Sequence, residues 1–316
     1  MRVRVAAVSL VDLLVVCALI ALLSAFVIPT TARVRELSKR SVCGINLAGI
    51  GAANKIYAES NTGRWPVPAF KNATIDQQGI EYTNCGRTIP GSGDVTCDRR
   101  FESRSETPSC FNCGSTQVAV TRAYWMMVRS GAITVKQFIC PSSGDIADPT
   151  VDLGLYYDFT RISNISYGYQ VPFGPRDTRP REGMDHRQVI AADKGPWYLP
   201  SKPNWNVGPQ YLPISLNDPP ILWRRFNSPN HGGSNSGEGQ NVLFADGSAS
   251  FVRMPAVGVD NDNIYTKMAA DPWVPPFNRI HGETPHEAPN SNTYPGQDVF
   301  GYGPGRQCTT DSLIYP

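Results

Sequence analysis

The sequence predicts an α+β protein in which one long N-terminal helix packs on an antiparallel β-sheet. Residues 5–28 form an apolar run, and an amphipathic stretch follows it to residue 57, so the two fit one continuous helix. Beyond residue 160, short segments with alternating apolar and polar residues are separated by Gly- and Pro-rich turns, as strands and loops are. An Asp-Gly pair between two such segments indicates a hairpin, and hence antiparallel strands.

The composition limits the classes of function. The chain has 316 residues and a formal net charge of +2, and its Lys and Arg residues beyond residue 60 form no basic stripe. A nucleic-acid partner is therefore not expected. The 28 Gly and 27 Pro residues gather after residue 140, which favours turns and long loops over helices in that part of the chain.

The apolar run has the length of a transmembrane helix, but it contains an acidic residue. About 20 apolar residues span a bilayer, and Asp12 lies within the run. A carboxylate costs roughly 2.5–3.5 kcal/mol at the centre of a membrane helix and less near an end, so we expect Asp12 to have a partner. A cleaved secretory signal and a simple membrane anchor both fit such a segment, but neither explains Asp12.

Residues 7–16, Ala-Val-Ser-Leu-Val-Asp-Leu-Leu-Val-Val, resemble the start of a type IV pilin or a type II secretion pseudopilin. The resemblance implies that residues 1–7 are a leader, that prepilin peptidase cleaves between Ala7 and Val8, and that Val8 is then methylated. It also implies that Asp12 is the acidic fifth residue of the mature chain. In this chain Ala7, Val8 and Asp12 stand where the family usually has Gly, Phe and Glu.

Cleavage at this point would give Asp12 a partner. It frees an α-amino group at Val8, four residues before Asp12. When the amine of one subunit meets the carboxylate of its neighbour, each offsets the desolvation of the other, and the pair fixes the axial register of a filament. The alternative is a carboxylate that reaches the membrane surface without a partner.

The helix is expected to occupy residues 8–60. Residues 8–28 would be the transmembrane or filament-core part, and the amphipathic remainder would pack on a globular domain. Pro29 lies where many pilins carry a helix-kinking proline, and it lacks the backbone donor of one helical hydrogen bond, so we expect a local kink. The polar residues 60–63, Ser-Asn-Thr-Gly, predict the end of the helix.

A globular α+β domain is expected at 61–316, with a polar, Cys-rich insertion at 72–116. The insertion contains four cysteines, Cys85, Cys97, Cys110 and Cys113. Cys110 and Cys113 have the spacing of a zinc-ligand pair, which the first two cysteines lack. A four-thiolate zinc site is therefore one hypothesis, and two disulfides are the favoured alternative outside the cytoplasm.

Residues 117–130 predict a second helix, and Gly131 is expected to cap its end. The Cys-Pro-Ser sequence that follows at 140–142 resembles a stretch of large prepilin-like proteins, as does the sequence around Cys43. A disulfide between Cys43 and Cys140 would tie this segment to the long helix. Two buried free thiols are the alternative.

Four segments predict strands, at 165–171, 187–192, 241–245 and 248–252. The last two flank Asp246-Gly247, which predicts a tight type I′ hairpin turn. A histidine, His231, and a Gly-rich loop precede the hairpin, and this arrangement resembles the C-terminal signature of the same large prepilin-like family. Residues 253–316 are predicted to be a loop-rich extension.

Asp193, His231 and Asp246 form a candidate metal site at the end of one strand, in a loop and at the hairpin tip. Oxygen ligands would suit Ca²⁺, whereas the histidine would fit zinc or manganese better. The alternative is that Asp246 only caps its turn and His231 only bonds to the backbone. The sequence contains no pattern typical of a hydrolase nucleophile or a phosphate-binding loop.

The pilin resemblance implies a structural subunit of a type IV pilus or secretion pseudopilus, not an enzyme, with no required cofactor. Its partners would be further copies of itself in a helical filament, prepilin peptidase and the assembly machinery. It would reside in the inner membrane before assembly and in a periplasmic or extracellular filament afterwards. One alternative is a minor tip subunit that binds a ligand. Another is a membrane-anchored, metal-dependent hydrolase that uses Asp193, His231 and Asp246.

Overall fold

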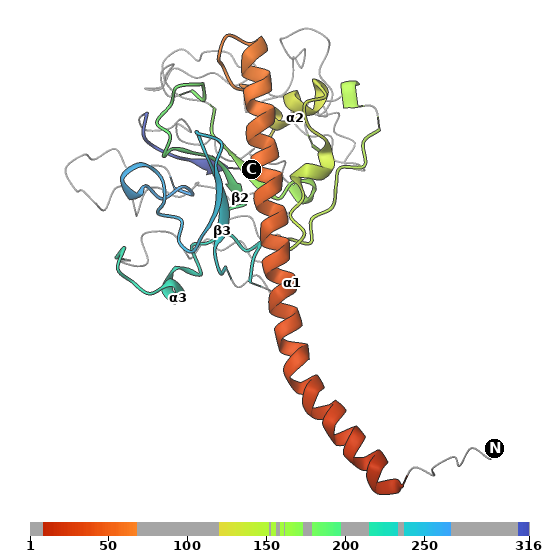
Figure 1. The fold of residues 1–316 in the computed structure, drawn as a ribbon. Helices are drawn as coiled ribbons and strands as arrows, with labels where there is room; N and C mark the ends of the chain where they lie inside the picture. The colour runs from red at the N-terminus through yellow and green to blue at the C-terminus, as the bar shows by residue number, and fades with distance from the viewer. Residues whose placement is uncertain are drawn as a thin grey trace, which may run out of the picture.

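The computed structural model has the predicted α+β fold, with one long helix beside an antiparallel sheet (Figure 1). The structure describes residues 9–67, 120–151, 153–155, 159–160, 162–172, 179–196, 215–232, 237–266 and 309–315. The expected leader at 1–7, the Cys-rich insertion at 72–116 and residues 267–308 of the C-terminal extension lie outside these ranges.

The long helix α1 spans Leu10–Ser60 and confirms the expected continuous helix of 51 residues. At 1.5 Å per residue it is about 75 Å long. A capping box closes its first turn, because the Asp12 N–H donates to Ser9 Oγ and the Ser9 N–H donates to Asp12 Oδ2, both at 3.1 Å. The helix continues through Pro29 and ends before Asn61, within the predicted Ser-Asn-Thr-Gly stop.

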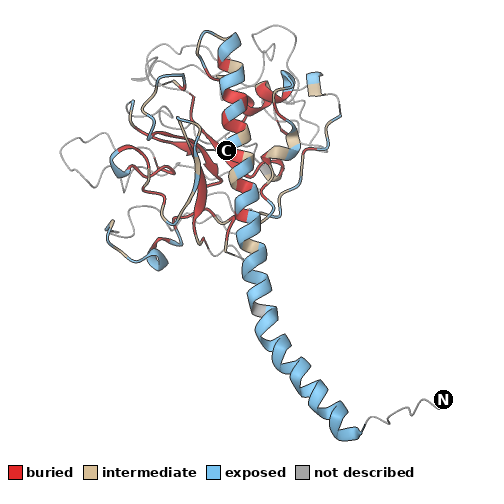
Figure 2. Ribbon diagram, in the orientation of Figure 1, coloured by how far each residue is buried: buried red, intermediate tan, exposed pale blue. Residues whose placement is uncertain are grey.

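The two halves of α1 have different surroundings (Figure 2). Every residue from 10 to 28 is exposed, and this part of the helix projects away from the domain. In the second half, Cys43, Leu47 and Ile50 are fully buried. Their spacing of four and then three residues places them on one helical face. This face packs on the sheet and supplies part of the hydrophobic core.

The sheet has five strands in the order β4-β3-β2-β1-β5, and all neighbouring strands are antiparallel. The strands are β1 at Tyr167–Gln170, β2 at Val189–Asp193, β3 at Gln240–Phe244, β4 at Ala249–Val252 and β5 at Ile314–Tyr315. The first four confirm the predicted strands, and α1 lies against β3 and β4. The expected loop-rich extension supplies β5, which pairs with β1 and was not predicted because two residues carry no periodicity.

The hairpin between β3 and β4 forms as predicted, but its turn is not type I′. The Gly247 N–H donates to the Phe244 carbonyl and the Phe244 N–H donates to the Ser248 carbonyl, both at 2.9 Å, so the loop holds three residues. A type I′ turn at this pair requires positive φ at both residues. Gly247 has a φ of 93°, but Asp246 is not among the described residues with positive φ. The Asp246 carboxylate instead accepts the Ser248 N–H at 2.7 Å and holds the wider loop.

The second helix, α2, spans Arg122–Arg129 within the predicted range. Gly131, with a φ of 76°, follows its end as expected. The Gly131 N–H donates to the Val128 carbonyl at 3.0 Å and the Ala132 N–H donates to the Met127 carbonyl at 3.1 Å, which is a Schellman motif. The other short helices are η1 (Val135–Phe138), η2 (Leu153–Leu155), η3 (Ile162–Asn164), α3 (Pro220–Trp223) and η8 (Val259–Asn261).

Aromatic side chains fix α2 in the main core beside α1. Tyr124 lies 4.7 Å from Phe138 between ring centroids, and Trp125 lies edge-on to Phe159 at 5.0 Å. The buried Tyr124 hydroxyl donates to the Gly168 carbonyl of β1 at 2.8 Å, so its polar end is satisfied inside the core. The domain therefore holds α1 between the sheet and the short helices that surround α2.

We expect Leu47→Ala to lower the free energy of unfolding by roughly 2–5 kcal/mol, because it leaves a cavity in the buried face of α1. Ile45→Ala is the matched control, since Ile45 is 70% exposed, and its effect should stay within about 0.5 kcal/mol. Denaturant unfolding of the full chain in detergent measures both. Equal losses in the two variants would contradict the assignment of the buried face.

Candidate functional site

Four side chains that could bind a metal ion meet where α1 enters the domain. They are Cys43, Cys140, Asp193 and His231, and we call them the polar cluster. Cys43 lies on α1, Cys140 follows η1, Asp193 ends β2 and His231 lies in the loop between α3 and β3. One donor atom from each side chain lies within 4.8 Å of the other three. All four residues are buried, with His231 and Asp193 at 0% exposure.

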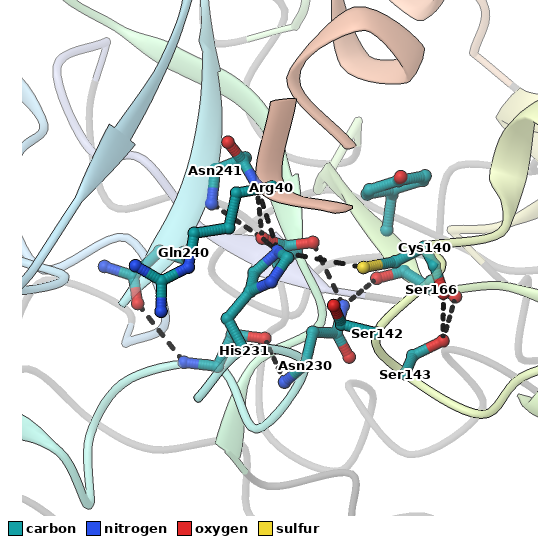
Figure 3. A network of polar contacts seen from close by, with 12 residues as sticks. Arg40, Cys140, Ser142, Ser143, Ser166, Asn230, His231, Gln240 and Asn241 are labelled. Carbon is teal, nitrogen blue, oxygen red and sulfur yellow. Dashed lines mark hydrogen bonds and ion pairs between the residues drawn. The ribbon is translucent and has the colours of Figure 1, made fainter. Parts of the chain in front are cut away.

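His231 is the centre of the cluster (Figure 3). Its Nδ1 lies 2.9 Å from Glu36 Oε1, and its Nε2 lies 3.2 Å from Asp193 Oδ2 and 3.7 Å from Cys140 Sγ. Burial lowers the pKa of His231, but Asp193 and Cys43 together raise it more, so the pKa is about 10. For the acidic Glu36, burial has the opposite effect and raises the pKa. Hydrogen bonds from His231 and Ser142 outweigh it, so the pKa of Glu36 is below its usual value.

Asp193 accepts hydrogen bonds from three neighbouring residues, two at its carboxylate and one at its backbone carbonyl. Asn230 Nδ2 donates to Oδ1 at 3.0 Å, and the Asn241 N–H donates to Oδ2 at 2.6 Å. The Tyr265 hydroxyl donates to the Asp193 carbonyl at 2.7 Å. A buried carboxylate needs such donors to offset its lost hydration, so the position of Asp193 is fixed before any ligand binds.

Next to the cluster, a chain of charged side chains joins α1 to the loop before β3. Arg40 forms ion pairs with Glu36, at 3.6 Å from Nε, and with Glu238. Arg33 also pairs with Glu238, at 3.1 Å. The Arg40 guanidinium lies 4.4 Å from the ring centroid of Phe251 in β4. These alternating charges neutralise one another at the edge of the domain.

The structure brings Cys43 and Cys140 together but leaves them as free thiols, so the disulfide considered between them is not formed here. A hydrogen bond from Cys140 lowers the pKa of Cys43 to about 7. The same interaction, together with burial, raises the pKa of Cys140. The pair therefore favours one thiolate, on Cys43, facing the imidazole of His231.

Asp246 does not belong to this group. Asp193 faces Asn241 near the start of β3, whereas Asp246 lies beyond the far end of that strand, roughly 15 Å away along the chain at strand spacing. Asp246 is exposed, and its carbonyl accepts from Lys55 Nζ at 2.9 Å. The expected three-residue site of Asp193, His231 and Asp246 is therefore not assembled. Cys43 and Cys140 lie beside Asp193 and His231 instead. The sequence had indicated that these two cysteines are neighbours, as a possible disulfide, but not that they adjoin the other two residues.

Six of the predicted site residues lie outside the described ranges. Ala7 and Val8 are outside the described residues, as are the four cysteines of the insertion, Cys85, Cys97, Cys110 and Cys113. At Pro29 the structure describes only the helical backbone. No family model, curated protein or solved structure matches the chain, so the role of the site follows from its own geometry.

The cluster combines donor types that bind metal ions with nearly complete burial. Its donors are sulfur, nitrogen and oxygen atoms that can bind a cation or share protons. Their burial keeps them from a substrate in solution. A catalytic metal needs an open coordination position with access for water, which the 0% exposure of Asp193 and His231 does not favour.

We expect Arg40→Met to lower the free energy of unfolding by roughly 2–4 kcal/mol, because it leaves Glu36 and Glu238 without their shared, largely buried cation. Arg33→Met is the control, because the Arg33 side chain is 53% exposed, and its effect should be under about 1 kcal/mol. Thermal and denaturant unfolding compare the two variants. A larger loss for Arg33→Met would overturn this assignment of roles.

Proposed function

We propose that the chain is a structural subunit of a filament of the type IV pilus or secretion-pseudopilus kind and assembles through α1. The observation that carries the proposal is the exposed first half of α1, which projects from a domain that buries the second half (Figure 2). By length and composition, this helix can span a membrane. A helix of this form can leave the bilayer and enter a helix bundle without refolding.

The exposed apolar surface of this half is large. The large apolar side chains from Leu10 to Ile28 are between 51% and 75% exposed. Burying one such side chain contributes roughly 1.5–3 kcal/mol, so this surface requires lipid or neighbouring helices. Lipid satisfies the requirement before assembly, and neighbouring copies of α1 satisfy it afterwards.

The second half of α1 favours a filament over a simple membrane anchor. From Ser41 to Asn54 the helix carries no charged residue. Val42 and Ile45 are 41% and 70% exposed, and at 100° per residue they point away from the buried Leu47 face. A lone anchor needs no such uncharged outer face beyond the membrane. Neighbouring subunits packed around a filament axis do need it.

The start of α1 supports the role proposed for Asp12. Its carboxylate accepts the Ser9 N–H at 3.1 Å and is exposed, so its second oxygen is available to a neighbour. In the proposed filament, cleavage after Ala7 frees the Val8 amine, which pairs with Asp12 of the next subunit. That amine lies one residue before Ser9 in the sequence. The pair sets the rise between subunits.

The subunit resides in the inner membrane before assembly and in a periplasmic or extracellular filament afterwards. Its required partners are copies of itself, prepilin peptidase and the assembly machinery. A hydrolase that uses Asp193, His231 and Asp246 is disfavoured, because Asp246 lies at the opposite end of β3 from the other two. Electron microscopy of sheared filaments, with the subunit identified by mass, distinguishes a main subunit from one found only at filament tips.

Intact-mass analysis of the subunit from filaments or membranes should find a chain that begins at Val8, with or without one methyl group. The loss of residues 1–7 would follow from prepilin-type processing. As a control, the same measurement in cells without prepilin peptidase should find residues 1–7 still present. A filament subunit that retains Met1 would contradict the proposed cleavage after Ala7.

Asp12→Ala should reduce filament yield by about tenfold or more. The variant loses one ion pair at each contact between subunits, and a loss of about 1.4 kcal/mol lowers an association constant tenfold. Ser9→Ala is the matched control, because it removes the other half of the capping box and keeps the carboxylate. Its cost of about 1 kcal/mol falls on the first helical turn alone. If both variants lost filaments equally, Asp12 would act only as a helix cap.

A further inference from the structure

We propose that the polar cluster of Cys43, Cys140, Asp193 and His231 is a closed structural zinc site. The four ligands come from four separate elements, α1, the segment after η1, β2 and the loop before β3. A metal ion held by them would cross-link α1 to the domain at the place where the helix emerges. This inference stands independently of the proposed filament.

The two distances from His231 Nε2 fit a tetrahedral centre. Zinc bonds of about 2.0–2.3 Å to nitrogen, oxygen and sulfur imply separations of roughly 3.2–3.8 Å between neighbouring ligand atoms. His231 Nε2 lies 3.2 Å from Asp193 Oδ2 and 3.7 Å from Cys140 Sγ. Cys43 Sγ completes the set, with all four atoms within 4.8 Å of one another.

The surroundings orient the ligands as metal sites require. His231 Nδ1 faces Glu36 Oε1 at 2.9 Å, so it can donate its proton outward and turn the lone pair of Nε2 into the cluster. Glu36 is itself held by the Ser142 hydroxyl at 3.0 Å. Asn230 Nδ2 holds the other oxygen of Asp193, Oδ1, at 3.0 Å. A carboxylate behind a ligating histidine is a common second layer of zinc sites.

Without a metal ion, the contacts around His231 Nε2 conflict. Asn241 Nδ2 lies 3.0 Å away and needs a lone pair on Nε2, whereas Asp193 Oδ2 at 3.2 Å needs a proton on the same atom. Turning the amide of Asn241 does not solve this, because its oxygen would then face Asp193 Oδ2 at 3.3 Å. A cation at the centre satisfies Nε2 and Oδ2 together and leaves the amide free to donate to a ligand.

The ligand types identify the metal class. Thiolate and imidazole ligands suit zinc, whereas Ca²⁺ takes oxygen ligands only, so the Ca²⁺ considered from the sequence does not suit this site. Four protein ligands fill a tetrahedral shell and leave no position for water, which is the pattern of a structural site. A disulfide between Cys43 and Cys140 would engage neither Asp193 nor His231.

Metal analysis of the full chain tests the proposal, with the protein purified in detergent through a tag that binds no metal. The Cys43→Ser/Cys140→Ser variant should contain one equivalent of zinc less than the wild type. The Cys110→Ser/Cys113→Ser variant is the matched control, because it removes the zinc-spaced pair of the insertion and should keep the equivalent at the cluster. X-ray absorption of this control should show two sulfur ligands and two lighter ligands.

Two further measurements keep the test decisive if the Cys43→Ser/Cys140→Ser variant does not fold. Glu36→Gln should weaken zinc retention against a chelator by about ten- to a hundredfold, as loss of a second-layer carboxylate does. Glu59→Gln, an exposed site near the end of α1, should leave it unchanged. Peptide mapping of unreduced wild-type protein should find no bridge between Cys43 and Cys140. A bridge there, or a Cys110→Ser/Cys113→Ser protein without zinc, would overturn the proposal.

Discussion

The packing of one face of α1 on β3 and β4 is the interaction on which the rest of the structure depends. It buries Cys43, Leu47 and Ile50 and thereby fixes the rotation of the helix about its own axis. Because α1 is continuous from Leu10 to Ser60, that rotation also sets the direction in which each side chain of the projecting half points. A single set of core contacts therefore orients both the exposed apolar half of α1 and the buried polar cluster.

Charge compensation makes the exit of α1 from the domain stable. At this edge, apolar packing gives way to Arg40, Glu36 and Glu238, whose charges alternate in space. A similar pair joins Lys194, the residue after β2, to Asp145 at 2.8 Å. Buried charges of this kind cost several kcal/mol when alone, so each one restricts the positions of the others. The charged side chains at this edge therefore restrict the position of α1, as the apolar core does.

The elements with strong local patterns were predictable, and those defined by distant contacts were not. Periodicity revealed α1, α2 and the four longer strands, and Gly131 marked a helix end because its positive φ is a local property. The three-residue turn at Asp246 depended on strand register, which the Asp-Gly pair alone does not determine. The two-residue strand β5 exists only through its pairing with β1.

The candidate site shows the same division. Asp193 and His231 could be selected as metal ligands from their residue types, and Cys43 and Cys140 could be considered as neighbours. What the sequence did not provide was the strand order that brings the end of β2 to the loop before β3. Asp246 was wrongly grouped with them, because the residue types alone do not say at which end of the sheet each side chain lies. The hairpin carries Asp246 to the opposite end of the sheet.

The place of β5 in the sheet has a consequence for how the chain folds. β5 covers the side of β1 that β2 leaves open, through the pair Tyr169 and Tyr315. Closing the long loop between β1 and β5 costs entropy, so we expect this strand to dock after the local hairpins have formed. Until then β1 presents a bare strand edge, which attracts strands from other chains. Docking of β5 therefore closes the one edge of β1 through which the unfinished sheet would pair with another chain.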